Sequence, residues 1–227
     1  MKKNFFIILF LAGFFLQAQN MTLHLGLNHA SQYRKVSDTK IDDSEFNLGY
    51  LAGVNFDFDL NKHWFLSPGL FFETKGVKSI VETSNPSQNS NNASFPLTYR
   101  LFYINIPVLI KKSFTINDNL ETYFGAGPYV GFRIGGCVKT DSCGSYDSWF
   151  LDTLYKTMDF GIQAETGLVY KQKFIFNLSY EYGISNIGKD FNVTYLDPIY
   201  GSPQISKIKY HIKNRVLSLS LGYRFKL

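Results

Sequence analysis

The sequence predicts an all-β protein, an eight-stranded antiparallel transmembrane β-barrel of the up-and-down type. The first observation is the stretch 215–227, where from Leu217 onward apolar residues alternate with serine, glycine, arginine and lysine. A period of two places each set on one face of a strand. The second observation is that this alternation recurs along the chain, and the third is that no apolar run of helix length follows Asn20. Strands with lipid on one face and a polar lumen on the other require this pattern.

The first four predicted strands cover 21–33, 46–60, 64–78 and 99–112. The first strand reads LHLGLN from Leu23, and the second reads FNLGYLAGVNFDF, with an apolar residue at every second position. In the third strand, Ser67, Glu73 and Lys75 share the inward face. The fourth carries apolar residues at alternate positions from Phe102 to Ile110.

The last four predicted strands cover 120–134, 157–171, 174–187 and 215–227. Inward glycines of the fifth and sixth strands leave room for bulky neighbours such as Tyr123 and Tyr129. The seventh strand reads FIFNLSYEY and alternates from Phe176 onward. Eight is an even number, which lets an antiparallel barrel close with both chain ends on one side.

Two prolines fall inside predicted strands. Pro107 lies in the fourth strand and Pro128 in the fifth. Proline donates no hydrogen bond to the ladder, and a closed barrel has no free edge to accommodate it. We therefore expect a bulge or local bend at each proline.

The connections alternate between short and long, which is the usual asymmetry of bacterial outer-membrane barrels. Short turns are predicted near Asn61, Asn117 and Gln172, and long loops over 34–45, 79–98, 135–156 and 188–210. The short turns and both termini are expected in the periplasm, and the long loops outside the cell. Segment 79–98 is rich in serine and asparagine and is expected to be mobile.

Residues 1–19 are typical of a secretory signal peptide, which leaves 20–227 as a single barrel domain. Lys2 and Lys3 precede an apolar run that ends at Leu16, and cleavage is expected near Ala18 or Gln19. The run is shorter than the about 20 residues of a membrane-spanning helix, which disfavours an N-terminal anchor. Export and alternating strands together predict the outer membrane of a Gram-negative cell.

The composition narrows the range of partners. The chain holds 22 Phe and 15 Tyr, and without Lys2 and Lys3 its 21 basic and 18 acidic residues leave a charge of +3. This excess is spread along the chain without a basic cluster, which argues against a nucleic-acid partner. Outer-membrane lipid or lipopolysaccharide is the expected surroundings.

Six motifs carry a family resemblance. They are PGLFFETKG (68–76), YINIPVLIK (103–111), YFGAGPYVGF (123–132), DFGIQAETGLVY (159–170), YEYGISNI (180–187) and NRVLSLSLGYRF (214–225). In order and spacing they resemble the outer-membrane β-barrel family of Bacteroidetes, the PorT-type porin family with an outer membrane protein beta-barrel domain. The resemblance implies an eight-stranded barrel in the outer membrane, and some relatives serve type IX protein secretion. The chain departs from the family by ending in Leu227, where an aromatic residue is more usual.

Charged side chains are predicted inside the barrel. An eight-stranded barrel of the OmpA/OmpX type has an interior that side chains can fill. The predicted lumen charge network comprises Glu73, Lys75, Arg133, Asp159, Glu165, Glu181 and Arg224. An isolated buried ion costs several kcal/mol, so these charges are expected to pair and to plug the lumen. An ion path along the same charges is the alternative.

The two cysteines, Cys137 and Cys143, lie close together in the predicted loop 135–156. At an oxidising cell surface this spacing predicts a local disulfide. A metal site is the alternative, but it would need two further ligands, and only Asp141 and Asp147 are near. We predict neither a metal nor a cofactor.

The histidines, at positions 24, 29, 63 and 211, form no recognisable catalytic pattern. A surface hydrolase would have to use His211, near the outer rim, with an acid from a loop. Outward aromatic residues near strand ends instead predict girdles at the two head-group levels. They are Tyr50, Phe58, Trp64, Phe102, Phe132, Tyr182 and Tyr223.

Together these features predict a monomeric, non-enzymatic outer-membrane barrel with a largely filled lumen. It would act through extracellular loops or periplasmic contacts, in an envelope, surface or secretion-associated role with an envelope or secretion protein as partner. The alternative function is a narrow channel or small-solute porin. The two differ in whether the inward charges plug the lumen or line a wet path.

Overall fold

A computed structural model describes residues 18–37, 39–41, 44–83, 93–140, 148–196 and 203–227. Residues 1–17 lie outside this set, so the signal peptide stays a prediction. Within the described residues, no helix is long and apolar enough to cross a membrane.

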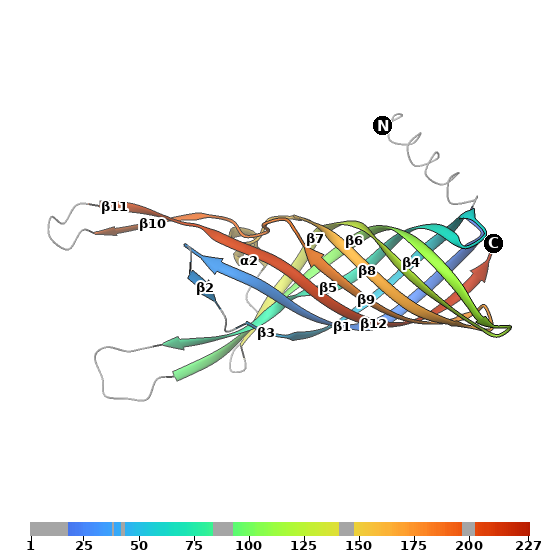
Figure 1. Cartoon of the computed structure of the whole chain (residues 1–227). Coiled ribbons are helices and arrows are strands. Elements are labelled where there is room, and N and C mark those ends of the chain that lie inside the picture. Colours follow the sequence, from blue (N-terminus) through green and yellow to red (C-terminus); the bar gives the residue numbers. More distant parts are fainter. Residues whose placement is uncertain (1–17, 38, 42–43, 84–92, 141–147, 197–202) are drawn as a thin grey trace, which may run out of the picture.

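Eight long strands close into a ring (Figure 1). Their bounds are β1 Asn20–Val36, β4 Asn47–Asn61, β5 Trp64–Thr83, β6 Ala93–Asn117, β7 Leu120–Thr140, β8 Met158–Tyr170, β9 Phe174–Gly183 and β12 Tyr210–Lys226. Each pairs antiparallel with its neighbours, and β12 pairs with β1 to complete the ring. The prediction of an eight-stranded antiparallel barrel is confirmed.

The two ends of the barrel differ. At the turn end, Asn20 pairs with Lys226, and turns of two or three residues join β4 to β5, β6 to β7 and β8 to β9. At the opposite loop end, strands of unequal length run beyond the ring (Figure 1). Both ends of the barrel domain therefore lie beside the short turns, as the alternation of connections predicts.

The predicted long loops contain regular structure, which corrects the sequence analysis. The additional elements are β2 Thr39–Ile41, β3 Ser44–Glu45, α2 Ser148–Leu154, β10 Phe191–Leu196 and β11 Pro203–Ile208. β6 alone spans 25 residues, whereas about 9–11 residues cross a bilayer. Beyond the lipid a ladder still pairs its backbone groups, but nothing there demands an apolar face, so the alternation that reveals a strand is lost. Of the segment 79–98 that is predicted to be mobile, 79–83 belong to β5 and 93–98 to β6, and 84–92 lie outside the described residues.

The barrel is apolar outside and polar inside. Along β1, Leu23, Leu25 and Leu27 are exposed while His24 and Asn28 are buried. β8 and β9 alternate in the same way over their whole length. This inverts the arrangement of a soluble domain, where apolar side chains fill the core, and it is the arrangement that a strand needs when lipid covers its outer face.

The predicted disturbance at the prolines takes a milder form than a bulge. β5 and β6 keep one register on both sides of Pro107, although Gly69 and Leu70 lack ladder partners there. β6 and β7 likewise keep their register across Pro128. The registers instead shift between Phe102 and Tyr103 and near Thr115. Each proline thus interrupts pairing without inserting a residue.

Outward aromatic rings gather in two bands. At the turn end, Phe174 meets the ring of Tyr223 edge-on at 5.5 Å between centroids, and the Nζ of Lys112 lies 5.1 Å from the ring of Trp64. Farther toward the loop end, Phe72 stacks between Tyr50 and Phe102. Trp64, Tyr223, Tyr50 and Phe102 are residues that the sequence assigns to girdles, and their depth in a bilayer stays a prediction.

Candidate functional site: the barrel lumen and its two ends

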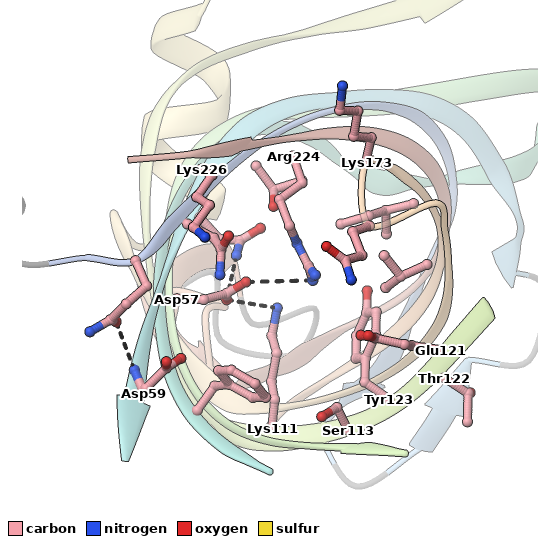
Figure 2. A pocket seen from close by; sticks show the side chains of 18 of the residues that line it. Asp57, Asp59, Lys111, Ser113, Glu121, Thr122, Tyr123, Lys173, Arg224 and Lys226 are labelled. Carbon is pink, nitrogen blue, oxygen red and sulfur yellow. Dashed lines mark hydrogen bonds and ion pairs between the residues drawn. The ribbon is translucent and has the colours of Figure 1, made fainter. Parts of the chain in front are cut away.

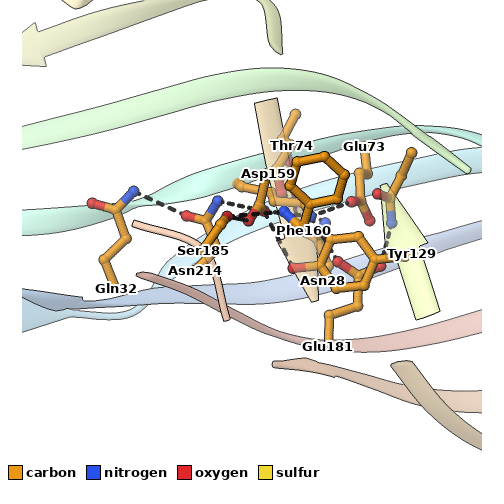
Figure 3. A network of polar contacts seen from close by, with 12 residues as sticks. Asn28, Gln32, Glu73, Thr74, Tyr129, Asp159, Phe160, Glu181, Ser185 and Asn214 are labelled. Carbon is orange, nitrogen blue, oxygen red and sulfur yellow. Dashed lines mark hydrogen bonds and ion pairs between the residues drawn. The ribbon is translucent and has the colours of Figure 1, made fainter. Parts of the chain in front are cut away.

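The middle of the lumen holds buried Lys75 among three acids, here called the Lys75 cluster. Figure 3 labels the acids, Glu73, Asp159 and Glu181. The Nζ of Lys75 lies 2.7 Å from Glu181, 3.0 Å from Glu73 and 3.3 Å from Asp159. The side chains of Lys75 and Asp159 are 0% exposed. One ammonium group therefore faces three carboxyl groups away from water, and the acids require further hydrogen-bond donors.

Neutral donors supply those hydrogen bonds. Asn105 donates to Glu181 at 2.7 Å, and Asn214 donates to Asp159 at 2.9 Å. Asp159 also accepts hydrogen bonds from the hydroxyl groups of Tyr129 and Ser185. Hydrogen bonds to a charged acceptor are the stronger kind, so these donors offset part of the carboxyl excess.

Aromatic rings complete the cross-section around the Lys75 cluster. The Nζ of Lys75 lies 4.4 Å from the ring centroid of Tyr129 and 5.1 Å from that of Tyr103. Tyr129 pairs with Gly161, where a Cβ would approach its ring to 2.5 Å. Glycine on β8 thus gives space to an inward ring on β7, as the alternation of glycines predicts.

A hydrophobic group closes the loop end, here called the loop-end plug. Its members are Leu101, Tyr103, Val138, Leu151, Tyr155, Ile187 and Ile212, and none is more than 2% exposed. Leu151 belongs to α2, and its Cδ1 lies beside Gly136 of β7. An apolar group that excludes water here blocks the end of the lumen toward which the longer strands point.

Polar contacts fasten α2 and Tyr155 to the barrel. Arg133 of β7 pairs with Asp152 at 2.5 Å and donates to the carbonyl of Tyr155. The guanidinium of Arg133 holds the pKa of Asp152 below its ordinary value, whereas burial raises the pKa of Tyr155. The Tyr155 hydroxyl therefore stays protonated and donates to Gln32, which in turn donates to Asn214. The plug and the Lys75 cluster thereby share one hydrogen-bonded chain.

A second group of charges lies toward the turn end, here called the turn-end cluster. Lys111 pairs with Glu165 at 2.7 Å, and Asp57 lies 3.8 Å from both Lys111 and Arg224. Lys111 and Arg224 reach from opposite walls toward Asp57 (Figure 2). Two cations here meet two carboxylates, in contrast to the carboxyl excess of the Lys75 cluster.

Asp57, Lys111 and Arg224 of the turn-end cluster line a cavity of about 630 Å³, the turn-end cavity (Figure 2). Residues from both ends of the barrel domain and from the turn Lys171–Lys173 line it, together with buried Tyr123. Tyr123 donates its hydroxyl to Asn177 at 2.8 Å. The lumen is therefore packed at the loop end and hollow at the turn end.

All seven predicted lumen charges are on the inner face, but they fall into three groups rather than one network. Four form the Lys75 cluster, two belong to the turn-end cluster, and Arg133 fastens the loop-end plug. The sequence analysis missed Lys111 and Asp57 as members. The alternation could have identified both, because they lie at odd positions, on the inward face of their strands.

Two other predictions concern the disulfide and His211. Cys137 is partly buried near the end of β7, but Cys143 lies outside the described residues, so the disulfide stays a prediction. His211 is an exposed residue of β12, opposite Lys35. The buried histidine is instead His24, whose Nε2 lies 2.6 Å from the Oδ1 of Asn55.

Comparison with known proteins settles the family. A model of the outer membrane protein beta-barrel domain matches residues 17–189. The chain belongs to that family. Its members' location indicates that this barrel lies in an outer membrane. A search of curated proteins finds no match.

Three solved outer-membrane barrels are similar to this member of the family. OprG from Pseudomonas aeruginosa is 12% identical, with a TM-score of 0.46 over 93% of this chain and 98% of its own. Neisserial surface protein A is 15% identical, with a TM-score of 0.45 over 90% and 97%. The outer membrane enzyme PagL is 10% identical, with a TM-score of 0.40 over 88% and 99%. No property of these proteins transfers to this chain.

Proposed function

We propose that the protein is a non-enzymatic outer-membrane barrel with a closed lumen, acting through contacts at its ends rather than by passing solutes. The observation that carries the proposal is the double closure of the lumen. The Lys75 cluster and its aromatic neighbours fill the middle, and the loop-end plug fills one end. A solute would have to displace both.

The finer assignment follows from the sequence motifs. We place the chain in the PorT-type branch of the family in Bacteroidetes, with residues 1–19 as a cleaved signal peptide. The turn end and the termini then face the periplasm, and the strands beyond the ring face the outside. A monomer in lipid or lipopolysaccharide, with a surface, envelope or secretion protein as partner, fits an end that projects well past the bilayer.

A narrow channel is the second candidate, because one observation favours it. The turn-end cavity opens one end of the lumen, and the buried side chains of the barrel include many polar ones. Conduction would need the loop-end plug to withdraw, which would require α2 to leave Gly136 and Arg133 to release Asp152.

An enzyme is disfavoured by the geometry of the one suggestive group. The Oγ of Ser220 lies 3.5 Å from the Nδ1 of His24, and the Nε2 of His24 contacts Asn55. These residue types could form a nucleophilic relay. However, His24 and Asn55 line the cavity while Ser220 does not, and the His24 ring lies over Gly222. A substrate in the cavity would meet the histidine rather than the hydroxyl.

The test is current across a planar lipid bilayer that contains the refolded protein in plain salt. Folding is verified independently by the altered gel migration of unboiled barrel protein. We expect no steady unitary conductance. A steady conductance that changes in Glu181→Gln or Arg224→Gln would show a water path and would replace the proposal with the channel.

A further inference from the structure

The turn-end cavity has the features of a ligand site that neither the fold nor the closed lumen requires. A purely structural lumen would be packed at both ends, yet about 630 Å³ stays open here. That volume lies within the ordinary range of small-molecule pockets, about 300–1,000 Å³. The question is which chemistry the lining would recognise.

Arg224 lines the cavity without a close ion pair. Its contact with Asp57 is a loose 3.8 Å, and 19% of its side chain stays exposed, so guanidinium nitrogens can face the cavity that Arg224 lines. Asp57 is meanwhile occupied by Ser67 at 2.7 Å and Asn55 at 2.9 Å. A guanidinium offers five donors in a planar fork that matches carboxylate and phosphate oxygens. The free donors of Arg224 therefore suit an oxyanion.

The remaining lining adds positive charge. Lys111, Lys171, Lys173 and Lys226 line the cavity with Arg224, against three acids, Asp57, Asp59 and Glu121. Lys171 and Gln172 have positive φ, 50° and 58°. The turn that carries two of these lysines thus adopts a conformation that non-glycine residues rarely take.

We propose that the turn-end cavity binds a small phosphate-bearing ligand, with Arg224 as the principal donor and the lysines at the rim as supporting charges. Several converging cations favour a phosphate, which carries more charge than one carboxylate. The cavity exceeds the size of phosphate alone, and Phe65, Val169 and Ile175 give its wall an apolar part. The rest of an organic phosphate would lie against that part.

The test uses the full-length mature barrel in micelles of an uncharged, phosphate-free maltoside detergent. The signal of the Arg224 Nε–H group is followed by NMR during titration with inorganic phosphate and, separately, with short-chain phosphatidylglycerol. Saturable movement of this signal with either probe is the expected result. Movement with phosphate identifies a free anion as sufficient, and movement with the lipid alone identifies a headgroup as the source.

Three variants distinguish binding at this site from attraction by general surface charge. Binding is measured by isothermal titration calorimetry. Arg224→Gln should weaken binding about tenfold or more, the scale of one lost bidentate contact. Lys226→Gln, at the exposed rim, should weaken it by a smaller factor. Lys62→Gln removes a charge from a turn at the same end but outside the cavity lining, and should change nothing.

Two results would overturn the proposal. One is the absence of saturable binding by wild-type barrel whose gel migration shows that it is folded. The other is an equal loss in Lys62→Gln and Arg224→Gln, which would reduce the effect to unspecific attraction. Neither result bears on conductance, so this proposal and the closed-lumen proposal fail separately.

Discussion

The Lys75 cluster and the turn-end cluster are built from the same residue types, yet water reaches them differently. Lys75 faces three carboxyl groups with no exposed surface of its own, whereas Lys111 and Arg224 face two beside an open cavity. Close packing in the first holds its one ammonium group against three acids. The cavity beside the second leaves donors of Arg224 without a close acceptor. The comparison teaches that the same inward alternation of a strand can produce either a plug or a site, depending on what fills the space between opposite walls.

The largest predicted effect concerns the two lysines. Lys75→Met would leave three buried carboxyl groups without their cation and should lower the free energy of unfolding by about 3–5 kcal/mol. Lys111→Met should lower it by about 1–3 kcal/mol, because Arg224 still lies near Asp57, which lines the open cavity. The measurement is reversible urea unfolding in lipid vesicles. Equal losses for the two variants would show that the middle of the lumen is as wet as the turn end.

The next prediction compares apolar side chains at the two ends of the lumen. Leu151→Ala removes a fully buried side chain from the loop-end plug and should destabilise by about 2–5 kcal/mol. Ile175→Ala removes a side chain that already borders the turn-end cavity, so the loss should fall near the lower end of that range. Unfolding midpoints at constant denaturant dependence measure both. A larger loss in Ile175→Ala would contradict the contrast between a packed end and a hollow end.

The ring of strands was predictable because lipid imposes alternating apolar and polar residues on every strand that crosses it. The eight strands, the short turns and the inward side of each charge all follow from that period of two. Which charges pair with one another was not predictable. Lys75 meets Glu181 across 106 positions of sequence, and such contacts depend on the stagger of the strands around the ring. Local sequence carries little information about that stagger.

The loop-end plug was unpredictable for a different reason. The helix α2 has seven residues, SWFLDTL, too few to show a helical period inside a segment that read as loop. Its position depends on Arg133 and on the space above Gly136, which lie on another element. The strands that extend beyond the ring escape prediction as well, because the outer face there meets water and no longer has to be apolar.

A smaller effect concerns the strained turn at the rim of the turn-end cavity. Gln172→Gly should relieve a positive φ of 58° and stabilise by about 0.5–1 kcal/mol. Lys62→Gly in the turn between β4 and β5 is the matched control, since Lys62 is not among the described residues with positive φ. There glycine only adds freedom to the unfolded chain and should destabilise by a similar amount. Stabilisation in both turns would mean that the strain at Gln172 is not the cause.

The smallest effect is a pH dependence confined to the loop end. Arg133 lowers the pKa of Asp152 in the folded protein, so this ion pair stabilises the attachment of α2 at pH values above the ordinary carboxyl pKa. The contribution is lost as pH falls through the lowered pKa, below about 3.9. Amide hydrogen exchange across α2 should therefore accelerate at low pH beyond its intrinsic change, and Asp152→Asn should show that acceleration already at neutral pH. Asp118→Asn, in a turn at the opposite end, is the control and should leave α2 unchanged. If Asp152→Asn exchanges like the wild type at neutral pH, the packing of Leu151 alone holds the plug, and the polar contacts at this end are incidental to its closure.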